Sequence, residues 1–146
     1  LRPAGEHAAL RRVAQGAGFR LRVLSLQRLV AIPDSAGLAA ALAAPVRLYT
    51  SPAAVRFAAS QAEGRLRREG LDLAVGRGTA AALRRVGVAD ARSPERMDSE
   101  GVLALAELQA PIAQAVGIIT APGGRGVLIP ALRERGIEVR VAEVYR

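Results

Sequence analysis

The segment Leu48-Tyr49-Thr50-Ser51-Pro52-Ala53-Ala54-Val55-Arg56 predicts a buried strand that runs directly into a helix. Leu48 and Tyr49 favour extended structure, and Pro52 suits the first helical position because its missing N–H is not needed there. Ser51 would be the N-cap, whose hydroxyl accepts from a backbone N–H of the first turn. The remaining N–H groups of that turn can bind an anionic group. Taken alone, the motif is more typical of an ordinary helix start.

The same strand–loop–helix arrangement recurs along the chain. After a helix at 6–17 and an extended segment at 19–30, helices are predicted at 36–43, 52–69, 100–108 and from 126 or 127 to Gly136, with one more ending at Gly87. Strands are predicted between them at 46–50, 71–75, 88–92, 116–120 and 137–146. This alternation predicts an α/β fold, a parallel sheet with helices on both faces.

The loops at the predicted carboxyl ends of three strands are rich in Ser, Thr and Gly. They cover 50–52, 76–79 and 121–125, and Ser99 is expected to cap a further helix. Ligands of parallel sheets bind at this edge. Several helix N-termini gathered there would hold a multiply charged anion through the helix dipole and charge-assisted hydrogen bonds. We therefore expect a ligand cleft at this edge.

Composition restricts the classes of partner and site. The net charge of +8 comes from Arg with no Lys and favours an anionic partner, whether nucleic acid, nucleotide or polycarboxylate. With no Cys and a single His, the chain offers no disulfide, thiolate or His-based metal site and no usual serine triad, and a reducing, cytoplasmic location is expected. No apolar run is long enough for a membrane span. Because the chain begins at Leu1, we expect residues before it.

Two other functions fit parts of the sequence. The run Gly76-Arg77-Gly78-Thr79-Ala80-Ala81 matches the G-x-G-x-x-A outline of a dinucleotide loop, so a nucleotide-binding module is the main alternative. An Arg-rich nucleic-acid binder is the third hypothesis, although only 3% of residues are aromatic, which argues against base stacking. For proton transfer the candidates are Tyr49 and Tyr145, and the pattern around Tyr145 favours an aromatic that packs on the sheet.

An ordered series of motifs across nearly the whole chain resembles the uroporphyrinogen-III synthase family. Each motif is weak alone, but their order and spacing together are specific. They are Arg2-Pro3-Ala4-Gly5, Thr50 to Phe57, Ala74-Val75-Gly76-x-Gly78-Thr79 to Leu83, Asp98-Ser99-Glu100-Gly101 to Leu105, Gly123-Gly124-Arg125-Gly126 with Leu132-x-x-x-Gly136, and Glu143-Val144-Tyr145-Arg146. The chain departs from the family at Gly76-Arg77, where Gly-Pro is usual.

The resemblance implies two flavodoxin-like α/β domains joined by a two-stranded linker. Residues 1–33 would be a partial first domain with the outgoing linker strand, 34–140 the complete second domain, and 141–146 the returning linker strand. On this template the chain is about half of the enzyme and is expected to be inactive alone.

The resemblance also implies an activity: cofactor-independent, dehydrating cyclisation of hydroxymethylbilane with inversion of the last pyrrole ring, in haem biosynthesis. The substrate carries eight carboxylates, in keeping with the positive charge. Tyr145 would be the catalytic acid, and no metal, nucleic acid or membrane is expected to take part. The full-length enzyme is expected to be a monomer. The expected substrate-binding residues are Arg2, Thr50, Ser51, Gly78, Thr79, Ser99, Gly124 and Arg125.

Overall fold

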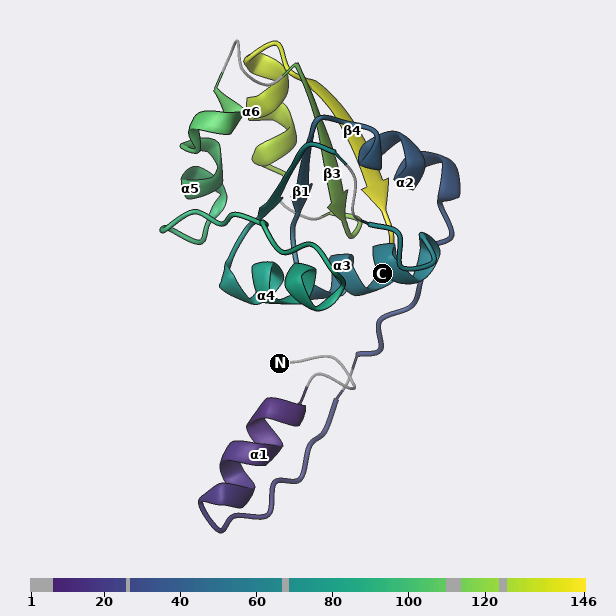
Figure 1. Cartoon of the computed structure of the whole chain (residues 1–146). Coiled ribbons are helices and arrows are strands. Elements are labelled where there is room, and N and C mark those ends of the chain that lie inside the picture. Colours follow the sequence, from purple (N-terminus) through teal and green to yellow (C-terminus); the bar gives the residue numbers. More distant parts are fainter. Residues whose placement is uncertain (1–6, 26, 67–68, 110–113, 124–125) are drawn as a thin grey trace. The chain divides into compact units, whose positions relative to one another are not determined.

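A computed structural model describes residues 7–25, 27–66, 69–109, 114–123 and 126–146 (Figure 1). The chain divides into two compact units, Leu1–Val30 and Ala31–Arg146. The helices are α1 Ala8–Gly16, α2 Ser35–Leu42, α3 Pro52–Gln61, α4 Arg77–Arg85, α5 Ser99–Leu103, the short 3-10 helix η1 Ala106–Leu108 and α6 Leu128–Glu134. The strands are β1 Val46–Tyr49, β2 Leu71–Ala74, β3 Ala115–Thr120 and β4 Glu138–Glu143. Within the described residues, no helix has the length and apolar character to cross a membrane.

The first unit contains α1 and the segment that follows it. α1 confirms the predicted helix over its described part. The alternating segment at 19–30 forms no strand in its described residues, because no neighbouring strand pairs with its backbone there. Its side chains and those of α1 are largely exposed, including Leu10, Val13, Phe19 and Leu24.

The second unit is built on a four-stranded parallel sheet with the order β2-β1-β3-β4. Tyr49 at the end of β1 pairs with Ala74 of β2 and with Ile119 of β3, so the carboxyl ends of these strands lie level. The predicted α/β class is confirmed for this unit. The expected strand at 88–92 is reduced to one parallel bridge between Leu73 and Arg92.

Helices cover both faces of the sheet, as Figure 1 shows. On one face α2, α3 and α4 pack against Tyr49 and Ile119 through Leu38, Val55 and Leu83. On the other face α5, η1 and α6 pack through Val102, Leu108 and Leu132 against strand side chains of the opposite parity, Leu48 and Ile118. Because helices lie on both faces, every residue of the central strands β1 and β3 is buried, whereas the edge strand β4 is partly exposed.

The N-cap predicted for α3 is confirmed, and the N-cap predicted for the helix at 100–108 is wrong. Ser51 caps α3 by accepting from the Ala54 N–H at 3.0 Å, and Asp34 caps α2 through Gly37. Ser99, expected to be a cap, is instead the first helical residue of α5. Asp98 is the N-cap and accepts from the Gly101 N–H at 2.8 Å, and its negative charge suits the positive end of the helix dipole better than a hydroxyl does.

α3 is shorter than predicted. It ends at Gln61 and not near residue 69, although its N-terminal half buries Val55 and Ala58 as expected. Glu63 and Gly64 have positive φ angles of 52° and 78°, and the Gly64 N–H bonds back to Ala59. This is a glycine-based helix end, and the apolar periodicity that continued to Leu66 concealed it.

Arg47 is completely buried in β1, beside the equally unexpected Asp72 of β2. Its Nε and Nη2 donate to the two carboxylate oxygens at 2.7 and 2.9 Å, and its Nη1 donates to the carbonyls of Glu69 and Ala44. The Asp72 hydrogen bonds raise the pKa of the Arg47 guanidinium. The pair ties β1 to β2 through a buried, bidentate salt bridge.

Gly117 allows α2 to lie close to β3. A Cβ at this position would stand 2.0 Å from the Ala41 carbonyl oxygen, a backbone atom that cannot move aside. We expect Gly117→Ala to lower the free energy of unfolding by about 1–3 kcal/mol through overpacking, measured by urea denaturation. Gly126→Ala is the control, since a Cβ there meets no atom within 4 Å; equal stability losses for the two would contradict the expectation.

Candidate functional site

The carboxyl ends of the four strands form one rim of the sheet. Backbone hydrogen bonds continue past the strand ends: Thr50 N–H donates to Ile119 at 3.1 Å, and Val144 N–H donates to Thr120 at 3.0 Å. The chain leaves β1 toward β2 on one side and returns to β3 on the other. The rim between β1 and β3 is thus the point where the strand order reverses, which is where open α/β sheets bind ligands.

Tyr145 and Ser51 meet at this rim although 94 positions separate them. The phenol oxygen of Tyr145 lies 2.9 Å from Ser51 Oγ. Ser51 Oγ already accepts from the Ala54 N–H, so its own proton is available to the phenol oxygen. With that direction of donation, the Tyr145 proton is left for a ligand.

The ring of Phe57 stacks on the ring of Tyr145. The two ring centroids are 5.3 Å apart and the planes differ by 10°, an offset stack. The Arg56 guanidinium lies 5.2 Å from the Phe57 ring centroid, which brings a cation to the same part of α3. The phenol is therefore held at its oxygen by Ser51 and at its ring by Phe57.

The N-termini of α3 and α4 are neighbours at the rim. A Cβ added to Gly78 would lie 3.8 Å from Pro52, so the two first turns face each other. The backbone N–H groups of Ser51, Ala53 and Gly78 have no hydrogen-bond partner among the residues that the structure describes. These three donors, together with the two helix dipoles, are suited to carboxylate groups of a ligand.

Met97 covers part of the α4 N-terminus. Its Sδ accepts from the Arg77 N–H at 3.5 Å and would lie 3.3 Å from a Cβ on Gly76. About half of the Met97 side chain remains exposed. A thioether is a weak acceptor, so a charged ligand oxygen would compete well for this N–H.

The hydroxyl groups of the rim mostly serve the protein itself. Thr50 Oγ1 donates toward Thr120 Oγ1 at 3.0 Å, and Thr120 Oγ1 donates to the Ala121 carbonyl at 3.3 Å. Thr79 is almost fully buried in the first turn of α4. The family resemblance predicts Thr50 and Thr79 as substrate-binding residues, and this role stays a prediction. Their hydroxyl groups are bonded or buried within the protein, which leaves the backbone N–H groups of these loops as the candidate ligand contacts.

The structure thus brings Thr50, Ser51, Gly78, Thr79 and Tyr145 to one rim. Ser99 lies buried at the start of α5, and its expected substrate contact stays a prediction. Three further predicted site residues lie outside the described residues: Arg2, Gly124 and Arg125. The predicted Gly76-x-Gly78 loop does begin α4 directly after β2, which both the synthase and the nucleotide hypotheses require.

Three residues of the rim were not predicted as site residues: Phe57, Met97 and Thr120. Phe57 could have been found, because it is one of only two Phe in the chain and follows Ser51 by less than two helical turns. Thr120 ends the apolar strand β3, and Thr50 directly follows β1, which is a weaker signal. The sequence around Met97 does not predict that this residue contacts the start of α4, because it lies in an irregular segment.

The N-cap of α5 makes a pH-dependent contribution to stability. The Gly101 N–H, and then the Arg96 guanidinium, hold the pKa of Asp98 below its usual value. A lowered carboxyl pKa stabilises the fold above the unfolded value, about 4, and this stabilisation is lost as the pH falls through the folded value. We expect the wild-type protein to unfold at a higher urea concentration than Asp98→Asn at pH 6, with the difference vanishing under acid. A pH-independent difference would refute the electrostatic origin.

Comparisons with known proteins were made against families and solved structures. The profile of the family described as "Uroporphyrinogen-III synthase HemD" matches residues 8–146. Two crystal structures of uroporphyrinogen III synthase from the extremely thermophilic bacterium Thermus thermophilus are similar in fold. A selenomethionine mutant has a TM-score of 0.65 at 20% identity, covering 95% of this chain and 57% of that chain. The wild type has a TM-score of 0.62 at 22% identity, covering 98% and 59%. A search of curated proteins found no match.

Proposed function

Because the chain belongs to the uroporphyrinogen-III synthase family, we propose that it forms one domain and the catalytic tyrosine of an enzyme that cyclises hydroxymethylbilane to uroporphyrinogen III. The chain spans 57–59% of the length of the two solved synthases, so the activity is proposed for the complete polypeptide. The proposed reaction is a cofactor-independent dehydration with inversion of the last pyrrole ring.

The observation that carries this proposal is the 2.9 Å hydrogen bond between Tyr145 and Ser51 at the shared rim of α3 and α4. It places a phenol beside the N–H groups of Ser51, Ala53 and Gly78. A proton donor next to several anion-binding groups is what a polycarboxylate that must lose a hydroxyl group requires.

In the proposed mechanism, substrate carboxylates bind the N-terminal turns of α3 and α4, with Arg56 and Arg77 adding positive charge. Tyr145 donates its proton to the hydroxymethyl oxygen as the C–O bond breaks, so the oxygen leaves as water. The last ring then attacks the resulting methylene carbon through the ring carbon that carries its bridge to the third ring. This bridge bond breaks and re-forms at the other, hydrogen-bearing α-carbon of the last ring, which inverts the ring, and the proton lost from that carbon restores the phenol. Ser51 donates to the phenol oxygen while it carries negative charge.

We also propose how the domains of the complete polypeptide are organised. We take the second unit as the flavodoxin-like second domain and the first unit as part of a first domain, joined by the two-stranded linker. Residues 141–143 of the expected returning linker lie within β4, while Ala31 and Tyr145 form a single antiparallel bridge. That bridge supports a two-stranded connection at the edge of the unit. The complete enzyme is proposed to be monomeric and cytoplasmic.

The test is conversion of hydroxymethylbilane by the complete polypeptide, with the products separated by chromatography. The asymmetric isomer is expected, formed without added metal or nucleotide. Detection of the symmetric isomer alone would overturn the proposal. The fragment spanning residues 1–146 serves as the comparison and is expected to be inactive.

A further inference from the structure

The side chain of Gln61 joins three segments that are far apart in sequence. Its Nε2 donates to the carbonyl oxygens of Ile32 and Val144, each at 3.0 Å, and its Oε1 accepts from the Asp34 N–H at 3.3 Å. The Ile32 N–H also donates to the Val144 carbonyl at 3.1 Å. One amide therefore fastens both the segment that enters the second unit and the segment that leaves β4 toward Tyr145.

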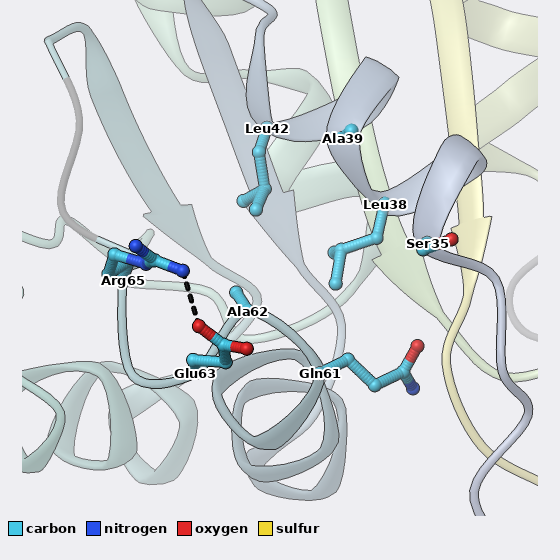
Figure 2. Close-up of a pocket in the computed structure, with 8 residues that line it drawn as sticks. All are labelled: Ser35, Leu38, Ala39, Leu42, Gln61, Ala62, Glu63 and Arg65. Atoms are coloured by element: carbon cyan, nitrogen blue, oxygen red, sulfur yellow. Dashed lines mark hydrogen bonds and ion pairs between the residues drawn. The ribbon is translucent and has the colours of Figure 1, made fainter.

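Gln61 ends α3 next to a surface cavity of about 370 Å³ between α2 and α3. Figure 2 shows its side chain extending toward the yellow ribbon that continues β4, away from the Glu63–Arg65 ion pair on the other side. The amide is only partly exposed, and both of its ends are bonded to backbone. Partly buried backbone groups need hydrogen-bond partners, and here the Gln61 amide supplies them. Its side chain therefore holds these backbone segments in position.

α3 contacts residues 144–145 at three levels along its length. Ser51 at its N-cap bonds the Tyr145 phenol, Phe57 in its middle stacks on the Tyr145 ring, and Gln61 at its last residue bonds the Val144 carbonyl. Phe57 and Gln61 are four residues apart and so lie on one helix face. The peptide just before Tyr145 is thus held by the same rigid element that carries the phenol's hydrogen-bond partner.

We propose that Gln61 is a positioning residue for Tyr145: its amide fixes the Val144 carbonyl, and with it the height and orientation of the phenol over Ser51. The inference rests on the proposed function for its kinetic consequence, since it takes Tyr145 as the acid. Gln suits the role because it offers two donors and an acceptor on one rigid end. Glu at neutral pH only accepts, and Met neither donates nor accepts strongly.

The first test is spectroscopic and needs no activity. With ring-labelled tyrosine, the chain gives resonances only from Tyr49 and Tyr145, and the Phe57 stack shifts those of Tyr145. Phe57→Leu assigns the shifted signal. Gln61→Met and Gln61→Glu are each expected to move it toward its Phe57→Leu position while the Tyr49 signal stays in place. Ser60→Ala, an exposed change on the same turn, is expected to leave both signals unchanged.

The second test is a double-mutant cycle on the complete polypeptide. Gln61→Met is expected to lower kcat about tenfold or more with little change in KM, since small misplacements of a reacting group are costly. In a Tyr145→Phe background the same change is expected to have less than about a twofold effect, because its target is gone.

The outcomes separate the two proposals. An unchanged Tyr145 resonance in both folded Gln61 variants, or equal losses of kcat with and without the phenol, would overturn the positioning role. Absence of synthase activity in the wild-type polypeptide would overturn the proposed function, while the resonance shifts would still decide whether Gln61 places Tyr145.

Discussion

Asp72→Ala is expected to lower the free energy of unfolding by about 3–5 kcal/mol, the largest stability loss that we predict for a single substitution in this chain. The loss is large because Arg47 stays buried after its partner carboxylate is removed. Arg47 is fully buried, and its guanidinium would lose two charge-assisted hydrogen bonds of 2.7 and 2.9 Å while keeping its charge. Urea denaturation monitored by circular dichroism measures the change.

A second variant distinguishes a lost attraction from an uncompensated charge. Arg47→Met/Asp72→Leu removes both charges and fills similar volume, and replacing a buried ion pair by apolar residues is often neutral or stabilising. We expect the double variant to be clearly more stable than Asp72→Ala. If it is equally unstable, the cost comes from packing and not from the charge.

An exposed ion pair provides the matched control. Glu138 and Arg140 lie two residues apart on β4, and their contact at 2.7 Å lowers the pKa of Glu138. Because solvent screens this pair, Glu138→Gln is expected to leave the urea midpoint nearly unchanged at pH 7. A large drop in the urea midpoint of Glu138→Gln would mean that exposed ion pairs stabilise this sheet more than expected for pairs screened by solvent.

The local parts of the fold were predictable from sequence because local chemistry determines them. Ser51-Pro52 predicts the start of α3 through the cap and the missing N–H, and the apolar run of β3 predicts a strand buried on both faces. The end of α3 was missed because the apolar spacing continued to Leu66, past a glycine whose backbone conformation was decisive. The 88–92 segment resembled a strand by composition, but only Arg92 pairs.

Contacts across long sequence separations were not predictable in the same way. Arg47 resembles an exposed cation on a strand until the register of β1 and β2 places Asp72 opposite it. Tyr145 resembles a sheet-packing aromatic, and its ring does pack, on Phe57. Its hydroxyl, however, reaches Ser51 because β4 ends at the rim where α3 begins. The candidate site therefore depends on topology, which strand-by-strand patterns do not supply.

Tyr145→Phe is expected to lower kcat of the complete enzyme about 100-fold, near the lower end of what a general acid contributes, and to leave measurable activity. Activity persists because binding and orientation of the substrate by the helix N-termini are intact. Stability should change little: Phe keeps the stack on Phe57, and Ser51 keeps its bond to the Ala54 N–H. Initial rates over a range of hydroxymethylbilane concentrations separate kcat from KM.

Ser51 variants then divide the two roles of that residue. Ser51→Thr retains a hydroxyl for both the cap and the phenol, whereas Ser51→Gly costs the cap only a few tenths of a kcal/mol but removes the partner of Tyr145. We expect Thr to preserve kcat and Gly to lower it, less than Tyr145→Phe does, because the phenol proton is still present. If Ser51→Gly matched the wild type in kcat, the 2.9 Å contact would be structural only, and the acid at this rim would have to act without support from α3.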